Sequence, residues 1–175
     1  MYANTSSEGL HLIQRSARVL RYHTEDTLQK QTVGEHTYLV MWWVWALSGG
    51  APSAALLMAA LAHDTPEVVT GDVPAPTKRR AGLRQAYEAM EDDVYEAIGY
   101  AAPALSTQER KLLKLADLLE GLMFCVSEIE RGNRMILSVL RNYHNYIVEH
   151  TTLEDRTGPV AEALALADRC EAGAL

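Results

Sequence analysis

The residues best suited to chemistry are a histidine–aspartate pair, His63-Asp64, where an apolar Ala/Leu-rich segment gives way to a polar one. His36 opens an earlier buried segment, and Asp117 interrupts a later apolar helical face. Imidazole nitrogens and carboxylate oxygens together suit a divalent metal. A carboxylate in an apolar helix is also costly to bury unless it is paired or bound to a metal. Any one of these residues alone is more often a satisfied core or capping residue, so the hypothesis depends on the order H…HD…D.

The elements that must position these residues are helices. Apolar residues recur at helical spacing, and alternating runs rich in β-branched residues are few. Ser106 and Glu109 form an S-x-x-E capping box, which predicts the start of a helix. The prolines of segment 71–76 must interrupt helical structure. We expect an all-α protein of about six or seven helices, over residues 9–20, 35–47, 53–63, 77–99, 107–131, 133–150 and 159–169.

Composition excludes several classes of protein. The chain has 175 residues, 48% of them hydrophobic, and a net charge of −7. This length predicts one domain over residues 1–175, and the apolar content is too high for a disordered chain. The acidic balance argues against polymeric nucleic acid as a partner, although a local cationic pocket on an acidic surface still suits a small anion.

The chain also lacks the usual signals of export or membrane insertion. Its first residues show no signal-peptide pattern, and the most apolar run, Leu39 to Leu47, is well short of the ~20 residues that span a bilayer. Cys125 and Cys170 form no C-x-x-C pair and are expected to be buried thiols in a reducing compartment. We therefore expect a cytoplasmic protein without membrane contact, in the host cytoplasm if a phage encodes it.

Four segments resemble the HD-domain metal phosphohydrolases, and among them the YfbR-like 5′-deoxynucleotidases and the related phage dATP triphosphohydrolases (DatZ-like). The segments are Arg-Tyr at 21–22, Val-Gly-Glu-His at 33–36, residues 63–78, and Lys-Leu-Ala-Asp at 114–117. The pattern H-D-x-x-E-x-x-T-G-D-x-P-x-P-x-K of residues 63–78 is specific to this subfamily. The resemblance covers about residues 10–150 and implies an HD-domain helical bundle.

The resemblance implies a metal site and the groups that handle protons. The metal ligands would be His36, His63, Asp64 and Asp117, and Co²⁺, Mn²⁺ or Zn²⁺ would suit them best, with Mg²⁺ or Fe²⁺ as further candidates. Glu67, one helical turn after Asp64, would be the acid/base for the attacking water or the leaving oxygen.

Asp72 matches an acidic residue at the sugar and phosphate end of the family's pocket, where it would orient the 3′-hydroxyl or the water. An equally good alternative is a turn aspartate bonded to its own backbone.

The resemblance also implies the residues that bind substrate. Arg21 would grip phosphate with its planar guanidinium, and the ring of Tyr22 would pack against the sugar. The bacterial enzymes usually have Trp where this chain has Tyr22, so selectivity for deoxyribose is left open. Lys78 and Lys114 would neutralise phosphate near the metal, although a solvated surface position is nearly as good an interpretation of Lys114.

We therefore expect metal-dependent hydrolysis of the 5′ phosphate ester of a deoxynucleotide, with release of the deoxynucleoside. The cationic run Lys78-Arg79-Arg80 and the compact length favour a dNTP, dATP by resemblance, with triphosphate as the other product. The alternatives are a dNMP 5′-nucleotidase that releases inorganic phosphate, a (p)ppGpp or cyclic-nucleotide hydrolase, and a non-catalytic HD scaffold. Trp42, Trp43 and Trp45 cannot share one helix face, which favours a homo-oligomer, with a buried core alone as the alternative.

Overall fold

The computed structural model describes residues 5–78, 80 and 82–174 of the chain. Seven helices of nine residues or more account for most of these residues, so the all-α prediction is confirmed. Within the described ranges, extended pairing is limited to an isolated bridge between Leu20 and Thr32. The seven helices are α1 (Ser7–Ser16), α2 (Val33–Leu47), α3 (Ala54–Ala62), α6 (Arg84–Ile98), α7 (Thr107–Glu130), α8 (Leu137–His150) and α9 (Pro159–Ala172).

Three short elements complete the described structure. The single-turn helices α4 (Glu67–Thr70) and α5 (Ala75–Lys78) follow α3, and the 3-10 turn η1 (Arg134–Ile136) precedes α8.

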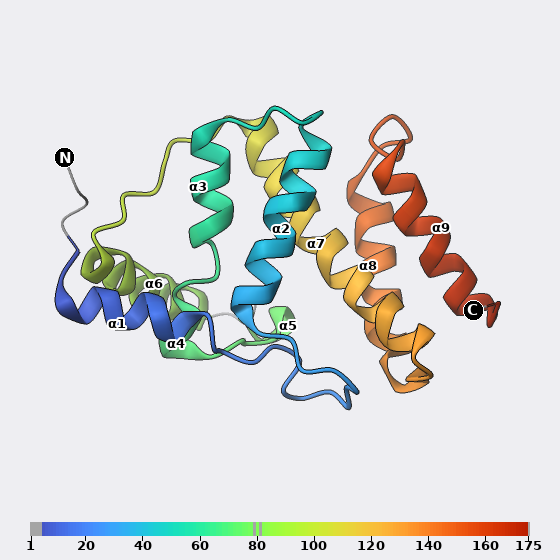
Figure 1. Cartoon of the computed structure of the whole chain (residues 1–175), viewed down its shortest axis with the longest axis horizontal. Helices are drawn as coiled ribbons and strands as arrows, with labels where there is room; N and C mark the ends of the chain where they lie inside the picture. The colour runs from blue at the N-terminus through green and yellow to red at the C-terminus, as the bar shows by residue number, and fades with distance from the viewer. Residues whose placement is uncertain (1–4, 79, 81, 175) are drawn as a thin grey trace.

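The 24-residue helix α7 is the element around which the others pack. It contacts α2 and α3 toward one end and α8 and α9 toward the other, as Figure 1 shows. A smaller group at the far side of the molecule brings α1 against α4 and α6. The long helix therefore connects the part of the fold that carries the His-Asp segment with the part that forms most of the core.

Buried apolar side chains form two neighbouring clusters on α7. The larger one joins α7 to α8 and α9 through residues such as Leu122, Leu140 and Ala167. The smaller one joins α7 to α2 and α3 through Val40 and Leu56, among others. Fully burying one Leu or Val side chain contributes about 1.5–3 kcal/mol, so these clusters fix how α2, α3 and α7 sit relative to one another.

Hydroxyl side chains fix the starts of the helices that matter for the site. Thr32 caps α2 by accepting the backbone N–H of Glu35, and Ser53 caps α3 in the same way. The predicted capping box of Ser106 and Glu109 is present at the start of α7. Each such cap contributes about 0.5–2 kcal/mol and defines the residue at which its helix begins.

The prediction of one continuous helix over residues 77–99 is wrong at its N-terminal end. The structure has the single turn α5, then a break, and α6 begins only at Arg84. Gly82 lies in this break with φ = +86°, a left-handed conformation that an α-helix does not contain. Of the cationic run that extends from Lys78, Arg79 lies outside the described residues, and Arg80 is exposed.

None of the described helices combines the length and the apolar character that a membrane span requires.

The loop between α1 and α2 is held by a buried carboxylate from α7. The side chain of Glu128 accepts the backbone N–H groups of Leu28 (2.6 Å) and Gln29 (2.9 Å), and the amide of Asn133 (2.8 Å). Burial raises the pKa of Glu128, but these three hydrogen bonds outweigh burial and lower it below its ordinary value. The ionised carboxylate therefore stabilises the loop that follows Arg21 and Tyr22.

We expect Glu128→Gln to lower the free energy of unfolding at pH 7 by about 2 kcal/mol, because the amide presents a donor to groups that already donate. Because the pKa of Glu128 is lower in the folded protein than in the unfolded chain, its charge stabilises the fold at pH values above the unfolded-state pKa. This stabilisation is lost as the pH falls through the folded-state pKa. Urea unfolding at pH 7 and at pH 3.5 measures the difference. A difference between the two proteins that is unchanged at pH 3.5 would contradict the role of the charge.

Candidate metal centre

Three helices bring the four predicted ligands to one point. His36 lies in the first turn of α2, His63 and Asp64 follow the end of α3, and Asp117 lies on α7. The Nε2 atom of His36 lies 3.3 Å from Nε2 of His63 and 3.3 Å from Oδ2 of Asp64. It also lies 3.4 Å from Oδ1 of Asp117, and Nε2 of His63 lies 3.4 Å from Oδ2 of Asp64.

The outer nitrogen of each imidazole is occupied, which points the inner nitrogen into the cluster. Nδ1 of His36 bonds Oε2 of Glu120, whose other oxygen accepts the side-chain amide of Gln31 at 2.6 Å. Nδ1 of His63 donates to the carbonyl of Ala60 at 2.7 Å. A neutral imidazole held in this way presents the lone pair of its Nε2 atom to the cluster, and such an outer partner is typical of metal-binding histidines.

This arrangement fits a divalent ion. Metal bonds of about 2.0–2.2 Å place neighbouring ligand atoms about 3.0–3.5 Å apart. The four donor–donor distances given above, 3.3–3.4 Å, lie in this range. His36, His63 and Asp64 each offer a ligand atom within 4.8 Å of the others. Two imidazoles and two carboxylates suit Zn²⁺, Mn²⁺, Co²⁺ or Fe²⁺ better than an all-oxygen site would.

The electrostatics of the cluster favour a positive charge at its centre. Burial lowers the pKa of His36, but hydrogen bonds to Asp117, Asp64 and Glu120 outweigh burial and raise it to about 10. Burial raises the pKa of Asp64, yet the facing imidazoles hold it well below its usual range. Burial likewise raises the pKa of Asp117, but the hydrogen bond to His36 and the charge of Lys114 outweigh burial and lower it. The carboxylates that stabilise a proton here equally stabilise a divalent ion in its place.

Glu67 lies at the start of α4, beside the cluster, and is buried. Its Oε1 accepts a hydrogen bond from Nζ of Lys78 at 3.2 Å, whereas its buried Oε2 has no hydrogen-bond partner among the described residues. Burial and the charge of Asp64 raise the pKa of Glu67 to about 8, against the opposing effect of Lys78. A carboxyl group with such a pKa can both give and take a proton near neutral pH.

Arg21 contacts the cluster directly, and Asp72 contacts the backbone of the next residue, Tyr22. Nη1 of Arg21 donates to Oδ2 of Asp64 at 3.2 Å, and Nε of Arg21 is buried without an acceptor among the described residues. Asp72 accepts the backbone N–H of Tyr22 at 3.0 Å, so its carboxylate holds the Arg21-Tyr22 segment rather than its own turn. Tyr22 has φ = +54°, a strained conformation for a residue other than glycine, and this contact helps to hold it.

The ring of Tyr22 is part of an aromatic group on α7 and α8. It stacks on Phe124 with ring centroids 4.5 Å apart, and its hydroxyl lies 3.2 Å from that of Tyr143. Tyr143 comes this close to α7 because residue 121 is glycine, where an added Cβ would lie 2.5 Å from the Tyr143 ring. One face of the Tyr22 ring is thus occupied by Phe124, and its predicted contact with a sugar stays a prediction.

Lys114 extends from α7 at the edge of the cluster. Its Nζ donates to Oδ2 of Asp117 at 2.7 Å, and its side chain is 56% exposed. This bond occupies the outer oxygen of Asp117 and leaves Oδ1 facing His36. Lys114 is therefore both near the site and accessible from solvent, and its predicted contact with phosphate stays a prediction.

The sequence analysis missed Glu120 and Gln31, which support His36 from behind. Both are buried, although both are polar. Glu120 follows Asp117 by three residues, which places the two carboxylates on the same side of α7. A second acidic residue at that spacing, within the apolar run Leu118 to Leu122, is a signal that could have indicated an outer partner for a metal-binding histidine.

The chain belongs to the YfbR-like 5′-deoxynucleotidase family, whose family model ("5'-deoxynucleotidase YfbR-like") matches residues 10–157. The predicted resemblance is thereby confirmed, and the protein is an HD-domain deoxynucleotide phosphohydrolase, a metal-dependent enzyme class.

Two kinds of curated relative are similar to the chain. A dATP triphosphohydrolase of Salmonella phage PMBT28 is 29% identical over 156 residues, which cover 81% of this chain and 79% of the relative. The 5′-deoxynucleotidase YfbR of Escherichia coli (strain K12 / DH10B) is 26% identical over 148 residues, which cover 71% of this chain and 74% of the relative. The two identities are too close to decide between the two reactions.

Solved structures share the fold. The HD phosphohydrolase DatZ of cyanophage S-2L, described as bound to dA and one catalytic Zn²⁺ ion, superposes with a TM-score of 0.62 over 98% of this chain and 99% of its own, at 18% identity. An HD-domain phosphohydrolase (lin2634) from Listeria innocua gives a TM-score of 0.60 over 95% of this chain and 98% of its own, also at 18% identity. At 18% identity, these structural similarities show that the chain shares the fold of the two proteins.

We expect Glu120→Gln to weaken divalent-metal binding about 10–100-fold, because the amide no longer supplies a charged partner to Nδ1 of His36. Isothermal titration of the metal-free protein with Mn²⁺ measures the affinity. Glu130→Gln, at the exposed end of the same helix, is the matched control and should leave the affinity unchanged. Equal affinity in the two variants would exclude Glu120 from the metal site.

Proposed function

We propose that this protein hydrolyses the 5′ phosphate ester of a deoxynucleotide and releases the deoxynucleoside, with dATP as substrate and triphosphate as the second product. The observation that carries the proposal is the convergence of His36, His63, Asp64 and Asp117 beside a buried Glu67 whose Oε2 has no partner among the described residues. Zn²⁺, Mn²⁺ and Co²⁺ are the preferred metals of the proposal, with Mg²⁺ and Fe²⁺ as further candidates.

The four donors would hold the ion, and Arg21, Lys78 and Lys114 would hold the phosphate. When bound, the ion supplies Lewis acidity to a phosphoryl oxygen and to a water molecule. The Nε of Arg21, which has no acceptor among the described residues, offers a phosphate oxygen a donor, while Nη1 keeps the guanidinium fixed against Asp64. Lys78 and Lys114 each pair with one carboxylate and still have N–H groups to donate, because an ammonium carries three donors.

Glu67 would manage the proton. At neutral pH its raised pKa keeps a substantial protonated fraction, so Oε2 can donate to the 5′-oxygen as its bond to phosphorus breaks. The salt bridge to Lys78 keeps Oε1 occupied and thereby fixes which oxygen faces the site. Asp72 would position Arg21 and would not itself react with the substrate, since its carboxylate holds the backbone of Tyr22 next to Arg21.

Two findings support the triphosphate as substrate. The relative with 29% identity is named a dATP triphosphohydrolase, and its match covers the larger share of this chain. Lys78 is followed by two arginines in the sequence, which suits a longer anion. The second candidate, a dNMP 5′-nucleotidase that releases inorganic phosphate, is favoured by the name of the matching family and by the YfbR relatives.

A substrate panel decides between them. The purified protein is incubated with each dNTP, dNMP and rNTP in the presence of Mn²⁺ or Co²⁺, and the released phosphate species are separated by ion-exchange chromatography. We expect deoxyadenosine and triphosphate from dATP, with little turnover of the ribonucleotide. Release of inorganic phosphate from dNMPs alone would establish the nucleotidase instead, and no turnover of any nucleotide would contradict both.

We expect Glu67→Gln to lower kcat by about 10²–10⁴-fold while metal binding is retained, because the amide fills the same space but cannot transfer the proton. Steady-state kinetics and metal content after dialysis measure the two effects. Glu96→Gln serves as the control, since Glu96 is an exposed carboxylate on α6. A kcat within about threefold of the wild-type value would exclude Glu67 as the acid/base.

A further inference from the structure

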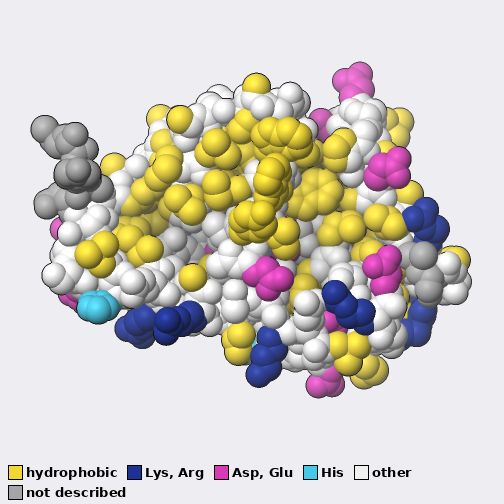
Figure 2. Space-filling model, in the orientation of Figure 1, with side chains coloured by type: hydrophobic (Ala, Val, Ile, Leu, Met, Phe, Trp, Pro, Cys, Tyr) yellow, Lys and Arg dark blue, Asp and Glu magenta, His cyan; other side chains and the backbone are white. Residues whose placement is uncertain are grey.

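Helix α3, which leads directly into His63 and Asp64, has no polar side chain of its own. Its nine residues are all Ala, Leu or Met. Its outward side is apolar surface, since Met58 and Leu61 are about half exposed, and Figure 2 shows hydrophobic side chains gathered over α2 and α3. Burial of apolar area is non-directional, so it holds α3 in the fold without setting its rotation or its position along its axis. The placement of the two ligands therefore requires directional bonds to this helix.

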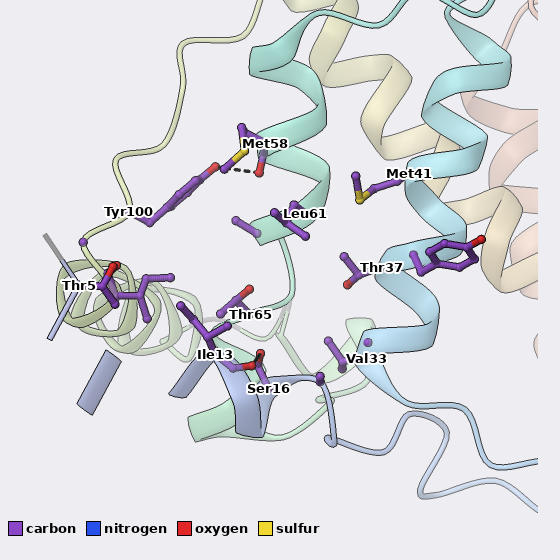
Figure 3. Close-up of a pocket in the computed structure, with 16 residues that line it drawn as sticks. Thr5, Ile13, Ser16, Val33, Thr37, Met41, Met58, Leu61, Thr65 and Tyr100 are labelled. Carbon is purple, nitrogen blue, oxygen red and sulfur yellow. Dashed lines mark hydrogen bonds between the residues drawn. The ribbon is translucent and has the colours of Figure 1, made fainter. Parts of the chain in front are cut away.

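Two such bonds hold the earlier part of α3. Oγ of Ser53, which caps α3, donates to Oε1 of Glu109 in the capping box of α7 at 2.6 Å. Further along, the hydroxyl of Tyr100 donates to the carbonyl oxygen of Met58 at 3.3 Å, as the dashed line in Figure 3 shows. Both bonds lie before the last turn of the helix, so neither acts on the backbone of a metal ligand.

The end of α3 is bonded by Tyr95, which extends from α6. The hydroxyl oxygen of Tyr95 lies 3.1 Å from the carbonyl oxygen of Ala62 and 3.5 Å from that of His63. The last carbonyls of a helix have no partner within the helix, so a donor from outside stabilises them. A hydroxyl has one proton to donate, and the shorter distance makes Ala62 its main acceptor. Burial raises the pKa of Tyr95 well above its ordinary value, so the hydroxyl keeps this proton.

The two carbonyls belong to the peptide groups on either side of His63. The carbonyl of Ala62 is part of the peptide group that precedes His63, and the carbonyl of His63 is part of the one that leads to Asp64. A peptide group is planar, so a bond to its oxygen also fixes the direction in which the chain leaves its nitrogen. The Tyr95 hydroxyl therefore acts at the point from which both ligand side chains depart.

Helix α6 is itself held in place, as a positioning element must be. Helix α1 lies so close to it that a Cβ added at Gly9 would lie 2.2 Å from the carbonyl oxygen of Ala97. Near the end of α6, the hydroxyl of Thr5 donates to the carbonyl oxygen of Ile98 at 2.9 Å. Tyr95 therefore extends from a helix that contacts with α1 fix in position.

The side of α6 that carries Tyr95 also faces the metal centre. Glu91 precedes Tyr95 by one helical turn and so lies on the same face of α6. Burial raises the pKa of Glu91, the charge of Lys78 opposes this effect, and the charge of Asp64 adds to it. Helix α6 also contacts α4, which begins at Glu67. This helix therefore lies over the segment that contains the ligand Asp64 and the proposed acid/base.

We propose that Tyr95 is a positioning residue of the metal centre, whose hydroxyl sets the end of α3 so that His63 and Asp64 meet His36 and Asp117 at ligand spacing. Tyr95 acts through the backbone of the two ligands and contacts neither the ion nor the substrate. A metal site needs its donors held close to the productive geometry, so a displacement of these two residues lowers the affinity for the ion. This role rests on the metal site of the proposed function.

A pair of tyrosine-to-phenylalanine variants tests the proposal. Tyr95→Phe and Tyr100→Phe each remove one hydroxyl that bonds a carbonyl of α3, and each keeps its ring, so Tyr100→Phe is the matched control. We expect Tyr95→Phe to weaken Mn²⁺ binding to the metal-free protein about tenfold, because the backbone of two ligands loses its outer partner. Tyr100→Phe should leave the affinity unchanged. Isothermal titration measures all three proteins.

The visible absorption of bound Co²⁺ provides a second measurement, because it depends on the coordination geometry. The spectra are recorded at a Co²⁺ concentration that saturates each protein. We expect the bands of Tyr95→Phe to differ from the wild-type bands in position or intensity, and those of Tyr100→Phe to match them. A role of Tyr95 in stability alone would leave the spectrum of the saturated protein unchanged.

Circular dichroism and thermal unfolding of the metal-free proteins establish whether each variant is folded. A folded Tyr95→Phe with wild-type Mn²⁺ affinity and a wild-type Co²⁺ spectrum would overturn the proposal. Equal losses in both variants would overturn it too, since the effect would then come from the packing of α3 in general. So would a Tyr95→Phe chain that does not fold, since the hydroxyl would then serve the whole fold. A wild-type chain that binds neither ion would contradict the metal site itself, and this role with it.

Discussion

The constraint on which this structure depends is the burial of two imidazole nitrogens and two carboxylate oxygens against one another. The Nε2 atoms of His36 and His63 face each other at 3.3 Å, and the Nδ1 atom of each ring has its own partner outside the cluster. Such a group is unfavourable unless a cation occupies its centre. The helices hold the donors together through contacts made elsewhere, and the site is thereby prepared for a divalent ion before the ion binds.

Helix α7 supplies most of that preparation. It carries Asp117 into the cluster, Glu120 behind His36, and Glu128 under the loop that follows Arg21. Its apolar side chains bury α2 and α3 against one flank and α8 and α9 against the other.

The sequence was most informative where a local rule determines structure. The capping box at Ser106 predicted the start of α7, and three residues of the order H…HD…D, His36, His63 and Asp64, offer ligand atoms within 4.8 Å of one another. It was least informative where tertiary contacts decide. The break around Gly82 interrupts a segment whose periodicity reads as continuous helix, and the Tyr22–Phe124 stack joins residues far apart in the chain. Glu120 was missed because its role appears only once His36 is placed beside it. The roles assigned to the ten site residues stay predictions that their geometry supports.

The central claim is that His36, His63, Asp64 and Asp117 hold one divalent ion. The most direct measurement is the metal content of the purified protein and of Asp117→Asn after equilibration with Zn²⁺ or Mn²⁺ and removal of free metal, with protein concentration from amino-acid analysis. We predict about one ion per wild-type chain and a loss of at least tenfold in affinity for Asp117→Asn, which keeps its shape but lacks the charge. Equal metal content in the two folded proteins, or none in the wild type, would contradict the account.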